Sequence, residues 1–429
     1  MFIIDMISIS WLSTGLFMYA KIKREWCTFA KKNKMADQYQ IVLKPGKEAP
    51  VERFHPWVFS GAIMDVKGNP KPGDLVDVQD YRTQHLGWGF YEKSSLAVKI
   101  FSFDKDAPDQ AFWTKRIADA YYARKSAGLT SSKDNNAYRL VFSEGDMMPG
   151  LIIDFYNGVA VFQANSLGMF SVRKEITKAL IEVYGESLKA VYNKSAVTLR
   201  NQAGISTTDS FLYGDLGVIE ILEHGCRYVI DVVNGQKTGF FLDQRENRRL
   251  LMNYAQGKRV LNTFCYTGGF SVVALAAGAK EVHSVDTSAP AIEATKENLK
   301  LNGFKHEVNP CVVKDALDYL GEMKEEFDVI VLDPPAFAKH HTQRHKALSA
   351  YKHINKAAFK KIAKGGIIFT FSCSQVVDRM TFHGIVAAAA IETGRQVRIL
   401  HQLNQPADHP MNIFHQEGEY LKGLVLLVE

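Results

Sequence analysis

The chain has few cysteines, and they are not arranged in pairs. Five occur among 429 residues, at positions 27, 226, 265, 311 and 373, and none forms a Cys-x-x-Cys pair. A disulfide framework and a metal site are therefore not expected, and the cysteine usage favours a reducing, cytoplasmic setting.

The chain also lacks an apolar run long enough to span a bilayer. The longest candidate, residues 6–20, has 15 residues, whereas a transmembrane helix needs about 20. Asp5 stands where a signal peptide has its basic region. Two interpretations stay open for residues 1–34: a weak membrane anchor, or sequence upstream of a true start at Met35. We favour the second and expect no stable membrane association.

Excess positive charge is nearly absent once residues 1–34 are set aside. The net charge is +6, and residues 1–34 supply six basic and two acidic side chains, or +4, which leaves +2 for the rest of the chain. Bulk charge therefore does not predict a nucleic-acid partner, and any basic surface has to be local.

The residue patterns predict an α/β chain of three domains. Short β-branched runs between turn signals predict a β domain over residues 35–107. Helical spacing near 108–128, followed by further strand-like and helical runs, predicts a central α+β domain over 108–215. Over 216–429, strands alternate with amphipathic segments, as in a Rossmann-like parallel sheet covered by helices. The final strand, near 420–428, is expected to pair antiparallel.

Two of these strands end in reactive side chains. Residues 328–335 read Asp-Val-Ile-Val-Leu-Asp-Pro-Pro, and residues 371–374 read Phe-Ser-Cys-Ser. Parallel strands deliver their carboxyl ends to the edge where doubly wound folds bind ligands, so we expect Asp333 and Cys373 at one site. A carboxylate beside a thiol indicates covalent chemistry on a planar ring. A small buried residue is the competing interpretation of Cys373, and Cys265 is a weaker candidate nucleophile.

A glycine-containing loop follows the first strand of the Rossmann-like domain. Gly268 and Gly269 allow a ligand to approach and begin a helix whose amides face it; helix–strand packing would explain the same glycines. The next strand ends in Asp286, where an acidic side chain accepts hydrogen bonds from ribose, and Asp315 follows the third strand. The fingerprint G-x-G-x-x-G is absent, so S-adenosyl-L-methionine (SAM) fits better than NAD or FAD.

Together these runs resemble the class I SAM-dependent methyltransferases and, more narrowly, the RlmI family of 23S rRNA (cytosine-5)-methyltransferases. The resemblance covers residues 39–429 and has no counterpart for residues 1–34. Its most specific part is the run Lys-Thr-Gly-Phe-Phe-Leu-Asp-Gln-Arg at 237–245 with Ser-Cys-Ser downstream. The markers are residues 55–61, Asp231 with 236–245, 264–270, 284–288, 333–335, 371–374 and 407–410.

The resemblance implies an N-terminal PUA domain, the central α+β domain and a C-terminal Rossmann-like SAM-dependent methyltransferase domain. The reaction that it implies adds the Cys373 thiolate to C6 of a cytosine in large-subunit ribosomal RNA, and Asp333 orients the base. The implied cofactor-binding residues are Phe264, Tyr266, Thr267, Gly268, Asp286, Asp315, Asp333, Lys237 and Arg245. The implied RNA-binding residues of the PUA domain are Lys44, Lys47, Arg53, His55 and Trp57.

Alternatives to these assignments stay open. Trp57 fits a core position as well as a stacking surface, and Asp243 with Glu246 would form a helix-capping network in place of cofactor contacts. An rRNA methyltransferase acting on a purine nitrogen needs no thiol, and a non-catalytic RNA-binding factor would use SAM as a ligand only. The sequence leaves open the target nucleotide, the group that activates the thiol and the formation of a homodimer.

Overall fold

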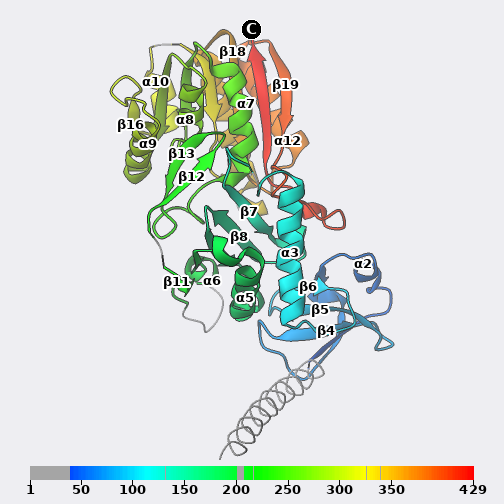
Figure 1. The fold of residues 1–429 in the computed structure, drawn as a ribbon. Helices are drawn as coiled ribbons and strands as arrows, with labels where there is room; N and C mark the ends of the chain where they lie inside the picture. Colours follow the sequence, from blue (N-terminus) through cyan, green and yellow to red (C-terminus); the bar gives the residue numbers. More distant parts are fainter. Residues whose placement is uncertain (1–38, 131, 201–206, 216, 325, 339) are drawn as a thin grey trace, which may run out of the picture. The chain divides into compact units, whose positions relative to one another are not determined.

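The computed structural model describes residues 39–130, 132–200, 207–215, 217–324, 326–338 and 340–429 (Figure 1). These residues divide into two units. One runs to Trp113 and includes Ser166–Val172, and the other contains Thr114–Asn165 and Arg173–Glu429. The interpretations of residues 1–34 and of a start at Met35 lie outside the described residues.

The first unit is built on a six-stranded sheet with the order β2-β6-β5-β4-β1-β3. Strand β1 pairs parallel to β4, and the other neighbours are antiparallel. Alternating β-branched residues turn one face inward, so that Ile41, Val76, Val98 and Ile100 are fully buried. The elements are β1 (Gln40–Leu43), α2 (Ala49–Glu52), β2 (Trp57–Phe59), β3 (Ile63–Lys67), β4 (Leu75–Gln79), β5 (His85–Tyr91) and β6 (Leu96–Ser102).

The second unit begins with the central segment, whose five strands have the order β11-β10-β9-β8-β7. Helix α3 (Gln110–Ser126) starts in the first unit and ends in the second. The other elements are β7 (Ala137–Phe142), β8 (Leu151–Tyr156), β9 (Val159–Ala164), α5 (Arg173–Tyr184), β10 (Ala190–Asn193), α6 (Ala196–Leu199) and β11 (Ser210–Tyr213).

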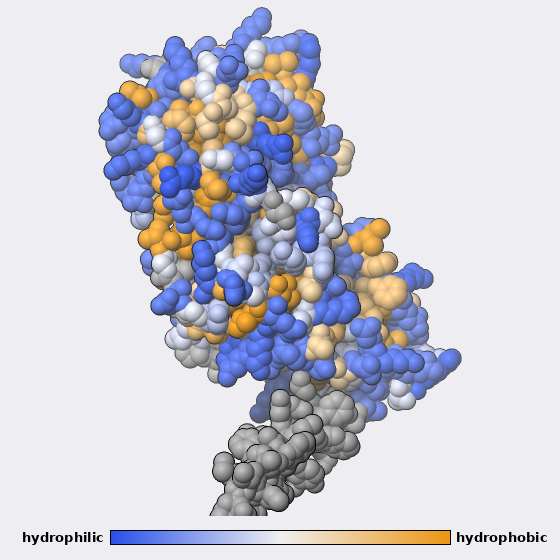
Figure 2. Space-filling view, in the orientation of Figure 1, coloured by the Kyte–Doolittle hydropathy of each residue, from blue (hydrophilic) through white to orange (hydrophobic). Residues whose placement is uncertain are grey.

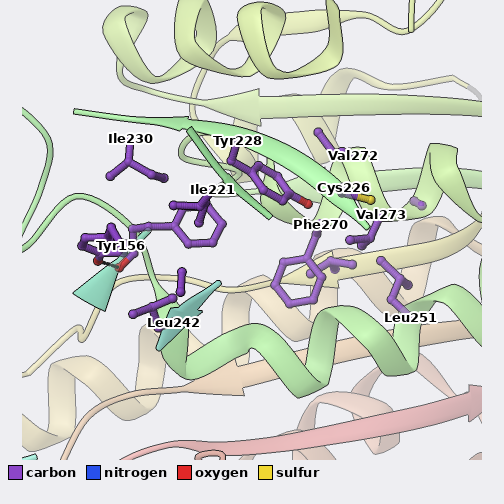
Figure 3. Packing of buried hydrophobic residues seen from close by; sticks show 14 of the residues in the cluster. Tyr156, Ile221, Cys226, Tyr228, Ile230, Leu242, Leu251, Phe270, Val272 and Val273 are labelled. Atoms are coloured by element: carbon purple, nitrogen blue, oxygen red, sulfur yellow. Dashed lines mark hydrogen bonds between the residues drawn. The ribbon is translucent and has the colours of Figure 1, made fainter. Parts of the chain in front are cut away.

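The central segment belongs to the same compact unit as the Rossmann-like part. The hairpin of β12 (Ile219–Glu223) and β13 (Cys226–Ile230) joins the two. Tyr156 of β8 shares one apolar cluster with Ile221, Tyr228 and Phe270 (Figure 3). The apolar core is therefore continuous from the central segment into the Rossmann-like part.

The Rossmann-like part has a seven-stranded sheet with the order β16-β15-β14-β17-β18-β20-β19. Strands β14 to β18 are parallel, and β20 pairs antiparallel with both neighbours, which confirms the expectation for the last strand. The strands are β14 (Arg259–Thr263), β15 (Glu281–Asp286), β16 (Cys311–Val313), β17 (Phe327–Leu332), β18 (Ile362–Ser372), β19 (Val397–Leu403) and β20 (Lys422–Val428). The helices are α7 (Arg245–Ala255), α8 (Gly269–Ala276), α9 (Ala289–Leu301), α10 (Ala316–Glu322), α11 (Arg344–Lys361) and α12 (Arg379–Thr393).

The middle strands of this sheet are apolar on both faces because helices cover both. In β17, Val329 and Val331 join the cluster that contains α7 and α8, whereas Ile330 and Leu332 join the cluster that contains α11 and α12. Strand β14 lies between β15 and β17, so the chain reverses direction across the sheet at this point. Ligands of open α/β sheets bind at such a switch point, outside the carboxyl ends of the strands.

Hydrophilic side chains cover much of the face seen in Figure 2, with apolar residues scattered among them. Within the described ranges, no helix has the length and apolar character that a membrane crossing requires.

Candidate active site

Asp333 and Cys373 lie at the carboxyl ends of two adjacent parallel strands. Asp333 directly follows β17, Cys373 directly follows β18, and Leu332 pairs with Thr370 in the register of these strands. The Cys373 Sγ atom is 3.9 Å from the backbone oxygen of Pro334, the residue after Asp333. The structure therefore brings the thiol and the carboxylate together at the switch point.

The Asp333 carboxyl group has a polar partner just before α7. Its Oδ1 atom accepts a hydrogen bond of 2.9 Å from Nε2 of Gln244. Burial, followed by the negative charge of Asp243, raises the pKa of Asp333 to about 7, and the Gln244 hydrogen bond opposes this increase. A carboxyl group whose pKa is raised toward neutrality can serve as an acid or as a base. Sequence reasoning missed Gln244, although it lies in the quoted run 236–245, because a neutral amide gives no charge signal.

The Cys373 thiol is half-buried. Burial and then the charge of Asp333 raise its pKa to about 11, while the cation of Lys237 opposes the increase. A proton on Asp333 removes the second of these effects, so the protonated acid and the thiolate favour each other. The rival thiol, Cys265, is buried and lies 3.7 Å from Oγ1 of Thr295 on α9, so its side chain packs against that helix.

The loop between β14 and α8 is held in an uncommon backbone conformation. Phe264, Tyr266 and Gly268 have φ angles of 56°, 47° and 80°. Two adjacent elements hold this loop: Tyr266 N donates to Oδ2 of Asp286 at 3.0 Å, and the Tyr266 hydroxyl donates to Gly239 O at 3.0 Å. Non-glycine residues in left-handed conformations cluster at ligand sites, where the surrounding structure sustains the strain.

The glycines of this loop are explained by close packing. A Cβ atom on Gly268 would lie 2.7 Å from Cγ2 of Thr295, and one on Gly269 would lie 3.1 Å from Cδ of Arg248. The packing interpretation therefore accounts for both glycines. Thr267 carries a different signal, because its Oγ1 atom is buried without a hydrogen-bond partner among the described residues. A buried polar atom without a partner indicates that a ligand or an ordered water binds there.

Asp286 and Asp315 lie at the ends of the next two strands. Asp286, at the end of β15, also accepts from Ser288 N at 2.9 Å. Asp315, two residues after β16, is exposed and caps α10 by accepting from Leu317 N at 2.8 Å. A carboxylate has about four lone-pair sites, so each group keeps acceptor capacity for ribose hydroxyls or an amino group.

Arg245 lies in a buried ion pair. Its side chain is 1% exposed, and its two terminal nitrogens bind the fully buried carboxylate of Asp408 at 2.9 Å each. The guanidinium group is thus engaged in a buried ion pair, and the expected contact of Arg245 with a cofactor stays a prediction. The alternative capping network is absent, since Asp243 accepts from the Tyr420 hydroxyl at 2.7 Å instead. Lys237 remains exposed, with a φ angle of 49° and its Nζ 5.0 Å from the Phe241 ring centroid.

The expected RNA-binding residues lie in the first unit, around β2 and α2. Lys44, Lys47 and Arg53 are exposed, and Lys44 Nζ donates to Gly61 O at 2.9 Å. His55 and Trp57 are half-buried and meet edge to face, with ring centroids 6.3 Å apart. Trp57 is therefore neither a core residue nor fully exposed. Two further aromatic residues beside them, which sequence reasoning missed, are about half exposed: Phe54 and Phe59.

SAM fits the residues present at the switch point. The carboxylates of Asp286 and Asp315 suit its ribose and adenine, and the buried Thr267 hydroxyl of the loop between β14 and α8 has no partner among the described residues. No cluster of metal-ligating side chains occurs among the described residues.

Comparisons with known proteins agree with this geometry. Residues 189–410 match the family described as S-adenosylmethionine-dependent methyltransferase, and residues 41–103 match a PUA-like domain. The fold and the site therefore define a SAM-dependent methyltransferase with an N-terminal PUA-like domain.

Curated relatives identify the family within this class of methyltransferases. The Ribosomal RNA large subunit methyltransferase I of Aeromonas hydrophila is 40% identical over 394 residues, covering 90% of this chain and 98% of the relative. The protein of the same name from Shewanella amazonensis is 39% identical over 396 residues, covering 91% and 99%. The chain belongs to the ribosomal RNA large subunit methyltransferase I family.

Solved structures support the fold. A Streptococcus mutans protein assigned as a SAM-dependent methyltransferase superposes with a TM-score of 0.76 at 23% identity, covering 90% of this chain and 99% of that one. A methyltransferase structure in complex with S-adenosylhomocysteine gives a TM-score of 0.78 at 24% identity, with the same coverage.

Proposed function

We propose that this chain methylates carbon 5 of a cytosine in large-subunit ribosomal RNA through a covalent bond between Cys373 and C6 of the base. The observation that carries the proposal is the thiol at the end of β18, 3.9 Å from the backbone of the residue that follows Asp333. The family match supports the methyl donor, and the names of the relatives support the class of RNA.

Carbon 5 of cytosine is too weak a nucleophile to take a methyl group unaided. The Cys373 thiolate forms a bond to C6, the C5–C6 π electrons shift through C4 toward N3, and N3 takes a proton from Asp333. SAM, when bound, would supply an electrophilic methyl group to C5 and leave as S-adenosylhomocysteine. The C5 proton then leaves to solvent, the electron pair of that bond restores the double bond to C6, and the thiolate is expelled while N3 returns its proton to Asp333.

The carboxyl ends of the parallel strands would hold SAM, the methyl donor. Asp286 accepts from the ribose hydroxyls and Asp315 from the adenine amino group. The loop residues Phe264, Tyr266, Thr267 and Gly268 form the wall beside them, and Lys237 supplies a positive charge near Asp333 and Cys373.

The first unit would bind RNA. Lys44, Lys47 and Arg53 offer cations to phosphates, while His55 and Trp57 offer ring surfaces to unstacked bases. The target cytosine has to leave its stack to reach Cys373.

A methyl-transfer assay with Cys373→Ala tests the proposal. Wild-type protein and radiolabelled SAM should produce 5-methylcytosine in unmodified ribosomal RNA, identified by mass mapping, and Cys373→Ala should produce none while binding SAM normally. Cys226→Ala is the matched control, because Cys226 is a buried cysteine of β13 in the apolar core. Methylation of a purine nitrogen that survives in Cys373→Ala would establish the enzyme alternative. Absence of transfer by the wild type would favour the non-catalytic factor.

A further inference from the structure

Gln244 lies where the chain turns into α7, and its amide connects two groups. It is 3% exposed and follows Asp243 in a short 3-10 turn, Leu242–Gln244. Its Nε2 atom donates to Oδ1 of Asp333 at 2.9 Å, and its Oε1 atom accepts from Nδ2 of Asn247 at 2.6 Å. Gln244 is thus buried and has a polar partner on each side.

Asn247 holds the amide oxygen of Gln244. It is 4% exposed and stands three residues further along, on the same face of the first turn of α7. Its Nδ2 atom donates to Oε1 of Gln244, and Nε2 of Gln244 donates to Asp333.

This arrangement makes the two carboxyl oxygens of Asp333 unequal. Oδ1 already accepts a hydrogen bond, while Oδ2 has no hydrogen-bond partner among the described residues. Asp333 keeps part of its surface exposed at the carboxyl edge of the sheet. A proton on this group is consequently favoured at Oδ2.

The charged groups around Asp333 come from several elements. Asp243 beside Gln244 raises its pKa, while Arg248 of α7 and Lys237 of the preceding turn lower it. Cys373 at the end of β18 and Tyr351 of α11 also interact with its charge. Asp243 is held by Tyr420, and Arg248 is held by a buried ion pair with Glu223, so both are constrained.

We propose that Gln244 is a positioning residue for the reaction, which, held by Asn247, occupies Oδ1 of Asp333 and leaves Oδ2 to exchange its proton with the pyrimidine. The inference rests on the proposed function, since it names the support of its acid. In the forward step, the O–H bond at Oδ2 breaks, the proton joins N3 as the Cys373 sulfur–C6 bond forms, and the carboxylate charge is stabilised by the Gln244 donor. The proton returns to the same oxygen when the thiolate leaves.

The pH dependence of kcat in Gln244→Leu tests this role. The reaction needs the proton on Asp333 and the thiolate of Cys373 together. Because the pKa of the thiol is the higher of the two, the rate rises with pH below the pKa of Asp333 and levels off above it, where the loss of the acid offsets the gain of the thiolate. Loss of a donor that favours the carboxylate raises the pKa of Asp333, so the break in the pH profile moves to higher pH. We expect kcat to fall about 10- to 100-fold, because hydrogen bonds to charged groups have this range of effect, with SAM affinity unchanged.

Gln163→Leu is the matched control. Gln163 is likewise a buried glutamine whose Nε2 donates a hydrogen bond, to Lys194 O at 3.2 Å, in the central sheet. Gln163→Leu should leave the break in the pH profile in place whatever its effect on stability. An unshifted break in Gln244→Leu, or equal losses of kcat in both variants, would overturn the inference.

A second variant, Gln244→Glu, tests the inference if Gln244→Leu fails to fold. Gln244→Glu keeps the shape of the side chain and donates to Oδ1 only when its own carboxyl is protonated, so its kcat relative to wild type should recover toward low pH. A loss of kcat that is equal at all pH values would refute the positioning role. Failure of the underlying reaction is distinguishable, since it would appear as retained activity in Cys373→Ala.

Discussion

Replacement of Asp408 by alanine should destabilise the second unit strongly. The Asp408 carboxylate accepts from both terminal nitrogens of Arg245, from the backbone N–H of Arg139 at 2.9 Å and from the His409 ring at 3.0 Å. Asp408 is fully buried and Arg245 is 1% exposed. In Asp408→Ala the buried guanidinium would keep only its 3.2 Å contact with Glu246, whose side chain is 48% exposed.

The expected loss is about 3–5 kcal/mol in the free energy of unfolding, the usual effect of removing one partner of a buried ion pair. With about 2–4 °C per kcal/mol for a domain of this size, Tm should fall by roughly 6–20 °C. The double variant Arg245→Met/Asp408→Leu removes both charges and should lose much less, because neither leaves an uncompensated ion.

Calorimetry and urea unfolding of the full chain at neutral pH measure both effects. A change below about 1 kcal/mol in Asp408→Ala, or a double variant less stable than the single one, would refute the reasoning. Titration calorimetry with SAM distinguishes a structural role of Arg245 from a role in binding the cofactor. Lost SAM affinity with unchanged Tm in Arg245→Met would identify it as a cofactor ligand.

Four further outcomes follow from the structure. His409 and Arg245 hold the pKa of Asp408 well below its ordinary value of 3.8, although burial opposes this. The difference in stability between wild type and Asp408→Ala should therefore be constant above about pH 4. It should shrink below that pH in acid unfolding curves. Asp286→Ala should weaken SAM binding about 10-fold or more by calorimetry, because it loses the ribose acceptor and the acceptor for Tyr266 N; unchanged affinity would place the ribose elsewhere. Asp333→Asn should abolish methyl transfer while Tm stays equal or rises, since burial disfavours the carboxylate; a large fall in Tm would assign Asp333 to the scaffold. In RNA-binding titrations, Arg53→Ala should reduce the salt slope by about 1, whereas Trp57→Ala should weaken binding at every salt concentration; a Trp57→Ala protein that binds normally would argue against stacking.

The strands that carry the site could be predicted because their signals are local. The apolar run before Asp333 and the run before Cys373 each identify a buried strand, and parallel pairing brings the ends of adjacent strands to one edge. The register of Leu332 with Thr370 agrees with that prediction. The antiparallel final strand was predicted in the same way, from a run of apolar residues after a long polar loop.

The supporting contacts could not be predicted, because they join polar groups far apart in the chain. Arg245 and Asp408 are separated by 163 positions, and Tyr420 and Asp243 by 177. An arginine in a motif beside a cofactor loop has the same local pattern whether it faces the ligand or a buried carboxylate. Gln244 lacks charge, so only its contacts with Asp333 and Asn247 identify it.

Covalent capture on a modified RNA tests the central claim most directly. Replacing the C5 hydrogen of the target cytosine by fluorine removes the proton whose loss expels the thiolate, so the sulfur–C6 bond should persist. With SAM and ribosomal RNA carrying 5-fluorocytidine, we predict a stable protein–RNA adduct that mass spectrometry of the digested complex locates on Cys373, and no adduct in Cys373→Ala. Undiminished turnover on ordinary RNA with no adduct on the fluorinated RNA, or an adduct on another residue, would contradict it.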